Sequence, residues 1–234
     1  MKKIILIIAT IIISSNAFSL KLYNSFHLGF SNYSKLDFDL ESMNKSTPYN
    51  INLEPFEPFV YGFLIRGEVV NSIWAQLQFK HRVKQKLADI DLADGNFNKY
   101  TTKLTNYTIA LDAIYSLKHQ GGDFMFGGGL GLSINNIDNI KGENQTENKQ
   151  ISIGDYTNTQ ELYHVLLGYK IRYKEQIDLE LLFDYNWLGY VETDKTISEI
   201  SQPSTQKTLD SNPKSKDKLR ALDITLGFVI PLTL

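Results

Sequence analysis

The feature that most constrains the fold is a strict alternation of apolar and polar residues along three consecutive segments of the C-terminal half. These segments span residues 165–173, 177–187 and 222–232. A period of two places alternate side chains on opposite faces of a strand, whereas a helix needs a period of about 3.6 residues. Each segment therefore predicts a β-strand with one apolar face and one mixed or polar face. The last segment carries its apolar residues at Leu222, Ile224, Leu226, Phe228, Ile230 and Leu232.

The same alternation, with less contrast, predicts five earlier strands and therefore an all-β chain. Apolar residues have some helical spacing only over Leu87–Leu92, which lies inside a long connection. Because each strand is joined to the next by a simple connection, neighbouring strands are expected to form hairpins. The sequence therefore predicts an eight-stranded antiparallel up-and-down β-barrel. The earlier strands are expected near Lys21–Asp37, Glu57–Glu68, Ile73–Lys84, Thr105–Leu117 and Asp123–Asn135.

The connections between the predicted strands alternate between a short and a long class. The short ones are Val69–Ser72, Lys118–Gly122 and Lys174–Gln176. Alternate connections of an up-and-down barrel emerge at the same end, and outer-membrane barrels combine short periplasmic turns with long extracellular loops. The polar composition of the long class predicts mobile surface loops without a core of their own. These four predicted loops span Phe38–Phe56, Gln85–Leu104, Ile137–Gln160 and Val191–Asp217.

Two kinds of barrel fit this alternation. A soluble lipocalin-like barrel has its apolar residues inside, and a membrane barrel has them outside. Aromatic residues lie at the ends of the apolar face, with Tyr169 and Tyr173 near one turn and Trp187 near one long connection. Such aromatic girdles are typical of the boundary between lipid and water. We therefore predict a transmembrane barrel, with lipid contact at Leu179, Phe183, Leu226 and Phe228.

The opposite face mixes glycine with charges of both signs, and the prediction places this face in the lumen. A buried charge without a partner is costly, whereas a matched network is tolerated. We expect Lys80, Arg82, Lys170 and Arg172 to pair with Asp112, Asp178, Glu180 or Asp184, which leaves at most a narrow path. The charged residues of this face are Arg66, Glu68, Lys80, Arg82, Asp112, Lys170, Arg172, Asp178, Glu180, Asp184 and Asp223.

Residues 1–19 predict a cleaved secretory signal. A positive start at Lys2 and Lys3 precedes an apolar run over Ile4–Ile13 that only Thr10 interrupts. Ten apolar residues are about half of the ~20 that a membrane-spanning helix needs. The small residues Ala17 and Ser19 form the two ends of the triplet that precedes the expected cleavage point after Ser19. The domain organisation is therefore predicted as a signal peptide over 1–19 and a barrel with four long surface loops over 20–234.

Composition excludes several classes of function. The formal charge of −2 argues against a nucleic-acid partner, because nucleic-acid binders carry a clustered basic surplus. With no cysteine, the chain has no disulfide framework and no thiolate metal site or nucleophile. The mean hydropathy of −0.22 is too polar for a helical membrane protein, but it permits a membrane barrel in which alternate residues are polar.

Motifs that would indicate catalysis or ligand binding are incomplete. The glycine run Gly127–Gly131 lacks the Lys-Ser/Thr pair of a phosphate-binding loop, and is expected to accommodate bulky neighbours in the barrel. The acidic segment Asp89–Gly95 has the wrong spacing for a calcium loop. Four histidines fall on different elements without metal-ligand spacing, so we predict no catalytic, cofactor-binding or metal residues and no cofactor. These histidines are His27, His81, His119 and His164.

The alternation pattern resembles the small outer-membrane β-barrel family that includes the opacity proteins and the N-terminal barrel of outer membrane protein A. The segments that carry the resemblance are 127–135, 167–173, 177–189 and 221–230. The resemblance covers the whole predicted barrel and implies an anchor in the bacterial outer membrane. Such proteins usually end on an aromatic residue, whereas this sequence ends at Leu234, with Phe228 as the last aromatic residue.

These observations predict a non-enzymatic surface protein whose loops bind a host or matrix ligand or support the envelope. The expected partners are outer-membrane lipid and lipopolysaccharide, with no nucleic acid, and the expected state is a monomer. Three alternatives remain open at this point: a small-solute porin, a soluble lipocalin-like periplasmic carrier and a lipid A-modifying enzyme. The enzyme would need an activated serine or water beside a histidine, and His81 is the best placed of the four.

Overall fold

The structure is a computed structural model that describes residues 22–40, 49–56, 59–89, 99–144, 149–174, 177–192, 196–201, 205–210 and 216–232. The predicted signal at 1–19 and nearly all of the acidic segment 89–95 lie outside the described residues. Within the described ranges, no helix is long and apolar enough to cross a membrane.

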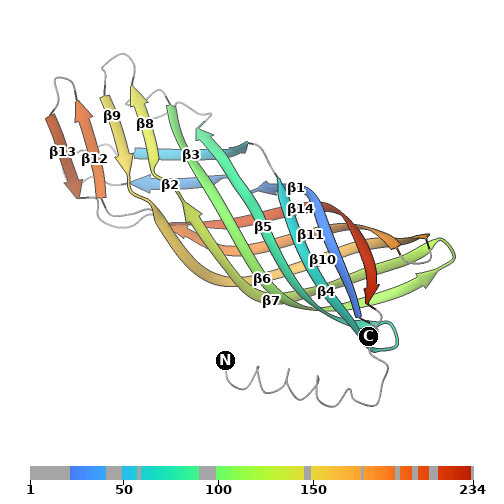
Figure 1. Ribbon diagram of the computed structural model, residues 1–234. Helices are drawn as coiled ribbons and strands as arrows, with labels where there is room; N and C mark the ends of the chain where they lie inside the picture. The colour runs from blue at the N-terminus through green and yellow to red at the C-terminus, as the bar shows by residue number, and fades with distance from the viewer. Residues whose placement is uncertain are drawn as a thin grey trace, which may run out of the picture.

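Eight long strands of the described chain form a closed antiparallel barrel (Figure 1). Each strand of this ring pairs with the next, and the last pairs with the first. Closure satisfies the backbone hydrogen bonds within the ring, which is a requirement for strands in lipid. The predicted eight-stranded up-and-down transmembrane barrel is therefore confirmed. Its ring strands are β1 (Leu22–Tyr33), β4 (Val60–Val70), β5 (Ile73–Asp89), β6 (Lys99–His119), β7 (Gly122–Ile137), β10 (Tyr156–Lys174), β11 (Ile177–Glu192) and β14 (Lys216–Leu232).

Several ring strands are longer than the alternation predicted. β5 continues to Asp89 instead of ending near Lys84, and β6 begins at Lys99 instead of near Thr105. Their backbones remain paired in this extension, from Gln85↔Leu104 to Ala88↔Thr101. The extension is polar in sequence, so the alternation of apolar residues that identified the strands fades there while the hydrogen-bonded ladder continues.

The described parts of the long connections contain six further strands, which corrects the prediction that they are loops. Three hairpins, β2–β3, β8–β9 and β12–β13, lie at one end of the barrel (Figure 1). We call this end the hairpin end and the opposite end the turn end. Two hairpins are joined directly to the ring, because β3 pairs with β5 and β8 with β6. The third is joined to the second hairpin, because β12 pairs with β9. Their strands are β2 (Leu36–Leu40), β3 (Tyr49–Phe56), β8 (Ile140–Asn144), β9 (Lys149–Ile153), β12 (Thr196–Ser201) and β13 (Thr205–Asp210).

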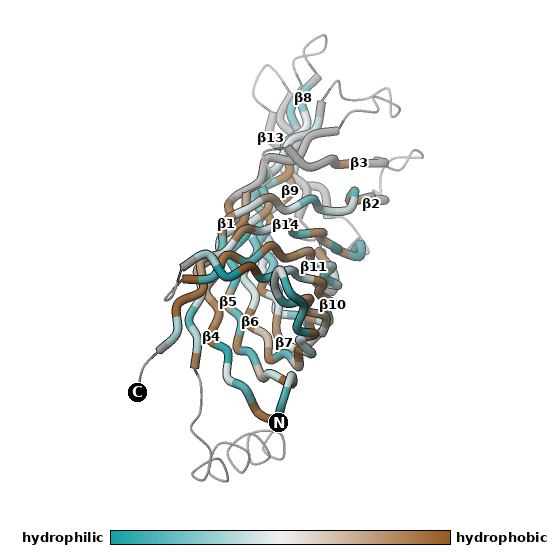
Figure 2. Tube along the Cα trace, turned by 90° about the vertical axis from the view of Figure 1, so that its right-hand side faces the viewer, coloured by the Kyte–Doolittle hydropathy of each residue, from teal (hydrophilic) through white to brown (hydrophobic). Residues whose placement is uncertain are grey.

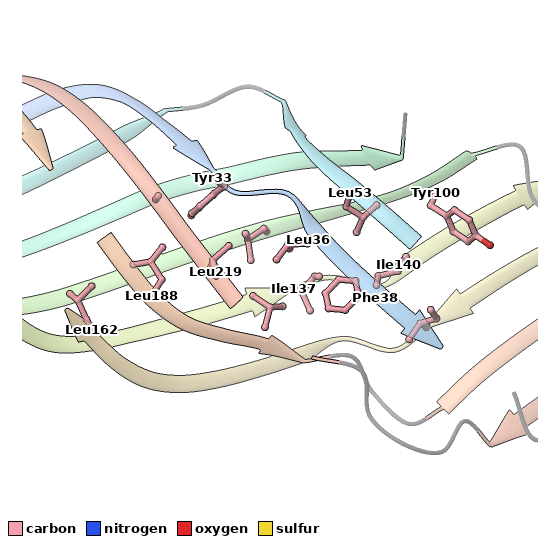
Figure 3. Packing of buried hydrophobic residues seen from close by; sticks show 14 of the residues in the cluster. Tyr33, Leu36, Phe38, Leu53, Tyr100, Ile137, Ile140, Leu162, Leu188 and Leu219 are labelled. Carbon is pink, nitrogen blue, oxygen red and sulfur yellow. The ribbon is translucent and has the colours of Figure 1, made fainter. Parts of the chain in front are cut away.

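Apolar side chains from the hairpins and the adjoining ring strands pack into one cluster at the hairpin end (Figure 3). Leu36 and Phe38 of β2, Leu53 of β3, Ile140 of β8 and Ile153 of β9 are fully or almost fully buried in it. The prediction that the long connections lack a core is therefore wrong for their described parts. A short strand whose apolar residues are interrupted by polar neighbours can still bury its apolar face when it packs against the rim of a barrel.

Hydrophobic and hydrophilic residues alternate along the ring strands (Figure 2), and the exposure of their side chains places the apolar ones outside and the polar ones inside. Leu226 and Phe228 are each 50% exposed on the outside, and Phe183 is 43% exposed. Leu179 is only half-buried on the same face. Between the outward positions of β14, Thr225 and Asp223 are buried inside. This arrangement confirms the expected orientation of the faces and excludes the lipocalin-like alternative, in which the apolar residues line the interior.

Candidate functional site

An ion-pair cluster fills the middle of the barrel interior. Lys80 Nζ lies 2.5 Å from Asp184 Oδ2 and 3.1 Å from Asp223 Oδ2. Arg82 donates to both carboxylate oxygens of Asp223, from Nε at 3.0 Å and from Nη2 at 2.6 Å, and its Nη1 donates to Asn106 at 2.6 Å. Because the guanidinium and the carboxylate are planar, this two-point contact fixes their orientation as well as their separation.

A second set of polar contacts lies next to the first. Arg66 donates to both carboxylate oxygens of Glu180, at 2.8 and 3.1 Å, and to the side-chain oxygen of Gln76 at 2.9 and 2.5 Å. The amide nitrogen of Gln76 donates to Asp112 at 2.6 Å. Polar contacts therefore link strands β4, β5, β6 and β11 across the interior.

His164 of β10 connects the two sets. Its Nδ1 lies 2.8 Å from Asp184 Oδ1, and its Nε2 lies 2.8 Å from Asp112 Oδ1. An ionised carboxylate only accepts hydrogen bonds, so both ring nitrogens donate and the imidazole is positively charged. Together with Arg66, Lys80 and Arg82, His164 balances the charges of the four carboxylates. We call these eight residues the lumen network; its carboxylates are Asp112, Glu180, Asp184 and Asp223.

Glycine at position 129 makes room for the lumen network. A Cβ at Gly129 would overlap with Asp112 Oδ1 and with His164 Nε2. Elsewhere in the ring, a Cβ at Gly227 would overlap with the ring of His27. The expectation that the glycines of 127–131 accommodate bulky neighbours is therefore confirmed at position 129, where any other residue would displace the network.

A second ion-pair group narrows the turn end. Lys170 lies 3.2 Å from Asp123 and 3.6 Å from Asp178, and its Nζ is 5.9 Å from the centre of the Trp74 ring. Between this group and Arg66 lies a cavity of about 10 Å³. That volume is at the lower limit for one water molecule. At the level of the lumen network and at the turn end, the described interior is therefore filled by side chains.

The packed interior predicts that the purified protein does not form a stable pore. Planar-bilayer recordings of the monomer should show no conductance, or small and erratic steps, because an eight-stranded barrel encloses only enough space for its side chains. A variant in which Arg66 and Arg82 are both truncated to alanine is the positive control for an opened lumen, provided that it folds. A stable, large conductance of the unmodified protein would contradict this prediction and favour the porin alternative.

Some of the predicted ion pairs are present in the structure. Lys80 pairs with Asp184, and Lys170 with Asp178, as expected. Arg82 instead pairs with Asp223, a residue that was assigned to this face but to no partner. Arg172 lies opposite Asp178 in the β10–β11 ladder, and its side chain is exposed near the turn end.

The histidines lie in four separate environments. His27 is buried in the interior beside Ser25, and His119 is exposed at the tight turn between β6 and β7. His81 points outward, with Nδ1 2.7 Å from the Tyr61 hydroxyl. Within the described residues, no group of three or more histidine, aspartate or glutamate side chains is arranged to hold a metal ion. His164, which joins the lumen network, was not singled out by the sequence because its two partners are 52 and 20 residues away.

A polar groove lies on the hairpin end, where β7 leaves β6 and β8 takes its place. Its volume is about 490 Å³. The Thr102 hydroxyl donates to the backbone oxygen of Asp138 at 2.7 Å, and the Asp138 amide donates to the backbone oxygen of Lys103 at 2.9 Å. These bonds hold the turn at 138–139 against β6. We call this feature the hairpin groove; it is lined by Thr101, Thr102, Lys103, Asp138, Asn139, Lys141 and Asp155.

Comparison with known proteins finds similarity in structure only. No protein-family model and no curated protein sequence matches the chain. A major outer membrane protein from Thermus thermophilus is similar with a TM-score of 0.51 at 11% identity, covering 92% of this chain and 100% of that one. Two further solved structures align with lower TM-scores. Neisserial surface protein A has a TM-score of 0.48 at 14% identity, covering 89% of this chain and 96% of that one. The outer membrane protein OprG from Pseudomonas aeruginosa has a TM-score of 0.47 at 12% identity, covering 90% and 95%.

The likeness to the Thermus protein agrees with what the chain itself displays. The ring of eight antiparallel strands is closed, its outer surface is apolar, and its interior is polar and charge-balanced. Such a surface is compatible with hydrocarbon outside and side-chain hydrogen bonds inside. The chain has the fold of the small bacterial outer-membrane β-barrels.

Proposed function

We propose that this protein is a non-enzymatic surface protein of a bacterial outer membrane, which uses its barrel as an anchor and its hairpin end to bind a ligand outside the cell. The proposal includes cleavage of a secretory signal after Ser19, orientation of the hairpin end to the exterior, and a monomer in contact with outer-membrane lipid and lipopolysaccharide. The apolar outer band supports the anchor, and the filled lumen disfavours a porin.

The observation that carries the proposal is the hairpin groove on a braced rim. Binding functions favour surface segments that a rigid scaffold positions. The apolar cluster under the hairpins supplies such a scaffold, since it joins residues of β2, β3, β8 and β9 to the ring strands. A groove of about 490 Å³ falls within the ~300–1,000 Å³ of typical ligand pockets.

The lining of the hairpin groove favours a polar ligand with hydroxyl and anionic groups, such as an acidic glycan of a host surface or matrix. Lys103 and Lys141 offer positive charge, and the threonine hydroxyls and Asn139 offer hydrogen bonds. Asp138 and Asp155 supply acceptors for sugar hydroxyls. Such mixed, hydrogen-bonding sites distinguish ligands by the cost of leaving buried polar groups unpaired.

A whole-cell binding experiment tests the proposal. Cells that display the protein should adhere to surfaces coated with acidic glycans, and Lys141→Glu should reduce adhesion severalfold, because the reversed charge repels the anionic group of the ligand. Lys216→Glu is the matched control, since Lys216 is an exposed lysine of β14 at the same end and is not part of the groove lining.

Limited proteolysis of intact cells accompanies this experiment. An added protease should cut the hairpin end only if that end faces outside. Equal adhesion of the two lysine variants, or protection of the hairpins in intact but not in opened cells, would refute the surface-binding role.

The enzyme alternative finds little support around His81. Its ring contacts the tyrosines Tyr61 and Tyr107, and the groove beside it has no serine among the described residues of its lining. Acyl transfer needs an activated nucleophile within hydrogen-bond reach of the base. The surface around His81 is better suited to binding than to acyl transfer.

A further inference from the structure

An apolar groove of about 450 Å³ lies on the outer surface of the barrel, across β4, β5, β6 and β7. Phe63, Phe79, Ile109 and Leu132 form its walls, and Gly62, which has no side chain, lies in its lining. We call it the membrane groove. It lies within the lipid-facing band, so it continues a surface that already contacts lipid, and hydrocarbon chains must fill it in the membrane.

The end of the membrane groove nearest the hairpins carries three polar aromatic side chains. His81 Nδ1 shares a hydrogen bond of 2.7 Å with the Tyr61 hydroxyl, and the two rings meet edge to face with their centres 5.0 Å apart. The Tyr107 ring stacks on the imidazole at 4.3 Å, with the two planes within 5° of parallel. The three rings therefore form an ordered unit rather than separate girdle residues.

The second ring nitrogen of His81 is unsatisfied. Nε2 is shielded from water and has no hydrogen-bond partner within the described residues. An unpaired polar atom in an apolar environment is costly. The outward neighbour on β5 toward the turn end is the apolar Phe79. A histidine at this lipid-facing position therefore departs from the apolar pattern of the outer surface. A polar ligand from outside the chain that bonds to Nε2 would explain this departure.

We propose that the membrane groove is a binding site for lipid A, with an acyl chain along Phe79 and Ile109 and the sugar head group at His81 and Tyr61. The inference rests on the proposed function, because it takes the hairpin end to be outside the cell, which places the groove in the outer leaflet. A hydroxyl or phosphate oxygen of the head group then satisfies Nε2.

Lipid retention by the refolded full-length barrel tests this site. The protein in detergent is incubated with lipid A or with phosphatidylglycerol, and bound lipid is counted by native mass spectrometry. The unmodified barrel should retain one lipid A. His81→Phe keeps the stacked ring and removes both nitrogens, and it should weaken retention by about five- to tenfold, the loss expected for one neutral hydrogen bond.

Tyr163→Phe is the matched control, because Tyr163 is another exposed tyrosine that is absent from the groove lining. Each variant is first shown to fold by its mobility on unheated gels, and Tyr61→Phe replaces His81→Phe if the latter does not fold. Equal retention by His81→Phe and Tyr163→Phe, retention of phosphatidylglycerol as strong as that of lipid A, or no retained lipid would each overturn the inference. Adhesion through Lys141 is measured separately, so failure of the lipid site and failure of the surface-binding role are distinguishable.

Discussion

Asp223→Ala should destabilise the folded barrel by about 3–5 kcal/mol, the range for removing one partner of a buried ion pair. The Asp223 side chain is fully buried and accepts hydrogen bonds from Lys80 at 3.1 Å and from Arg82 at 3.0 and 2.6 Å. Its removal leaves two neighbouring cations with a single carboxylate, that of Asp184, which His164 also shares. Urea unfolding in lipid vesicles, followed by tryptophan fluorescence and gel mobility, measures the change.

Two variants isolate the cause of this effect. Asp178→Ala removes a carboxylate that lies 3.6 Å from Lys170 at the turn end, where both side chains retain some contact with solvent, and should cost no more than about 1 kcal/mol. The double variant Arg82→Met/Asp223→Leu removes a charge of each sign and should be clearly less destabilising than the sum of the two single changes, because it leaves no unpaired charge from this pair. If Asp223→Ala costs no more than Asp178→Ala, the lumen network does not stabilise the barrel.

The strands of the ring could be predicted because the alternation of apolar and polar residues is visible within each short segment of sequence. Each strand must present apolar residues to lipid at every second position, and this requirement is written into segments such as 177–187 and 222–232. The count of strands, their order and their antiparallel pairing follow from these segments and from short connections. The irregularity of the β10–β11 ladder between Arg172 and Lys174 could not be predicted, because such a shift leaves no trace in the alternation.

The hairpins and the partners within the interior were not predictable from the same signal. Outside the membrane the outer face meets water, so the apolar–polar contrast that marks a strand disappears, and Phe38 and Leu53 were therefore assigned to a polar loop. Pairing inside the barrel depends on which strands face each other across the lumen: Arg82 and Asp223 are 141 residues apart. The sequence supplied the charges and their face, but only closure of the ring brings each charge to its partner.

Leu226→Arg should impair insertion by about 2–4 kcal/mol, the cost of an arginine on the lipid face near the middle of the bilayer. Leu226 lies centrally among the outward residues of β14, between Leu222 and Ile230, and its side chain is 50% exposed on the barrel surface. A charge there contacts hydrocarbon, and the interior carboxylates are on the other face of the sheet. Equilibrium folding into vesicles of defined thickness gives the free-energy difference directly.

Substitutions elsewhere on β14 distinguish the cost of placing a charge in lipid from a general sensitivity of this strand to substitution. Thr225 is 1% exposed and faces the interior, so Thr225→Ser keeps its hydroxyl and should fold almost as well as the unmodified chain. Lys218→Arg, at an exposed position of β14 at the hairpin end, should be equally silent because an arginine there meets water. The decisive comparison is between arginines at different depths in the bilayer. The free-energy cost of an arginine should fall progressively from position 226 to position 222 and then to position 218. A flat cost along these positions would mean that the apolar face does not contact lipid, and the transmembrane placement of the barrel would fail with it.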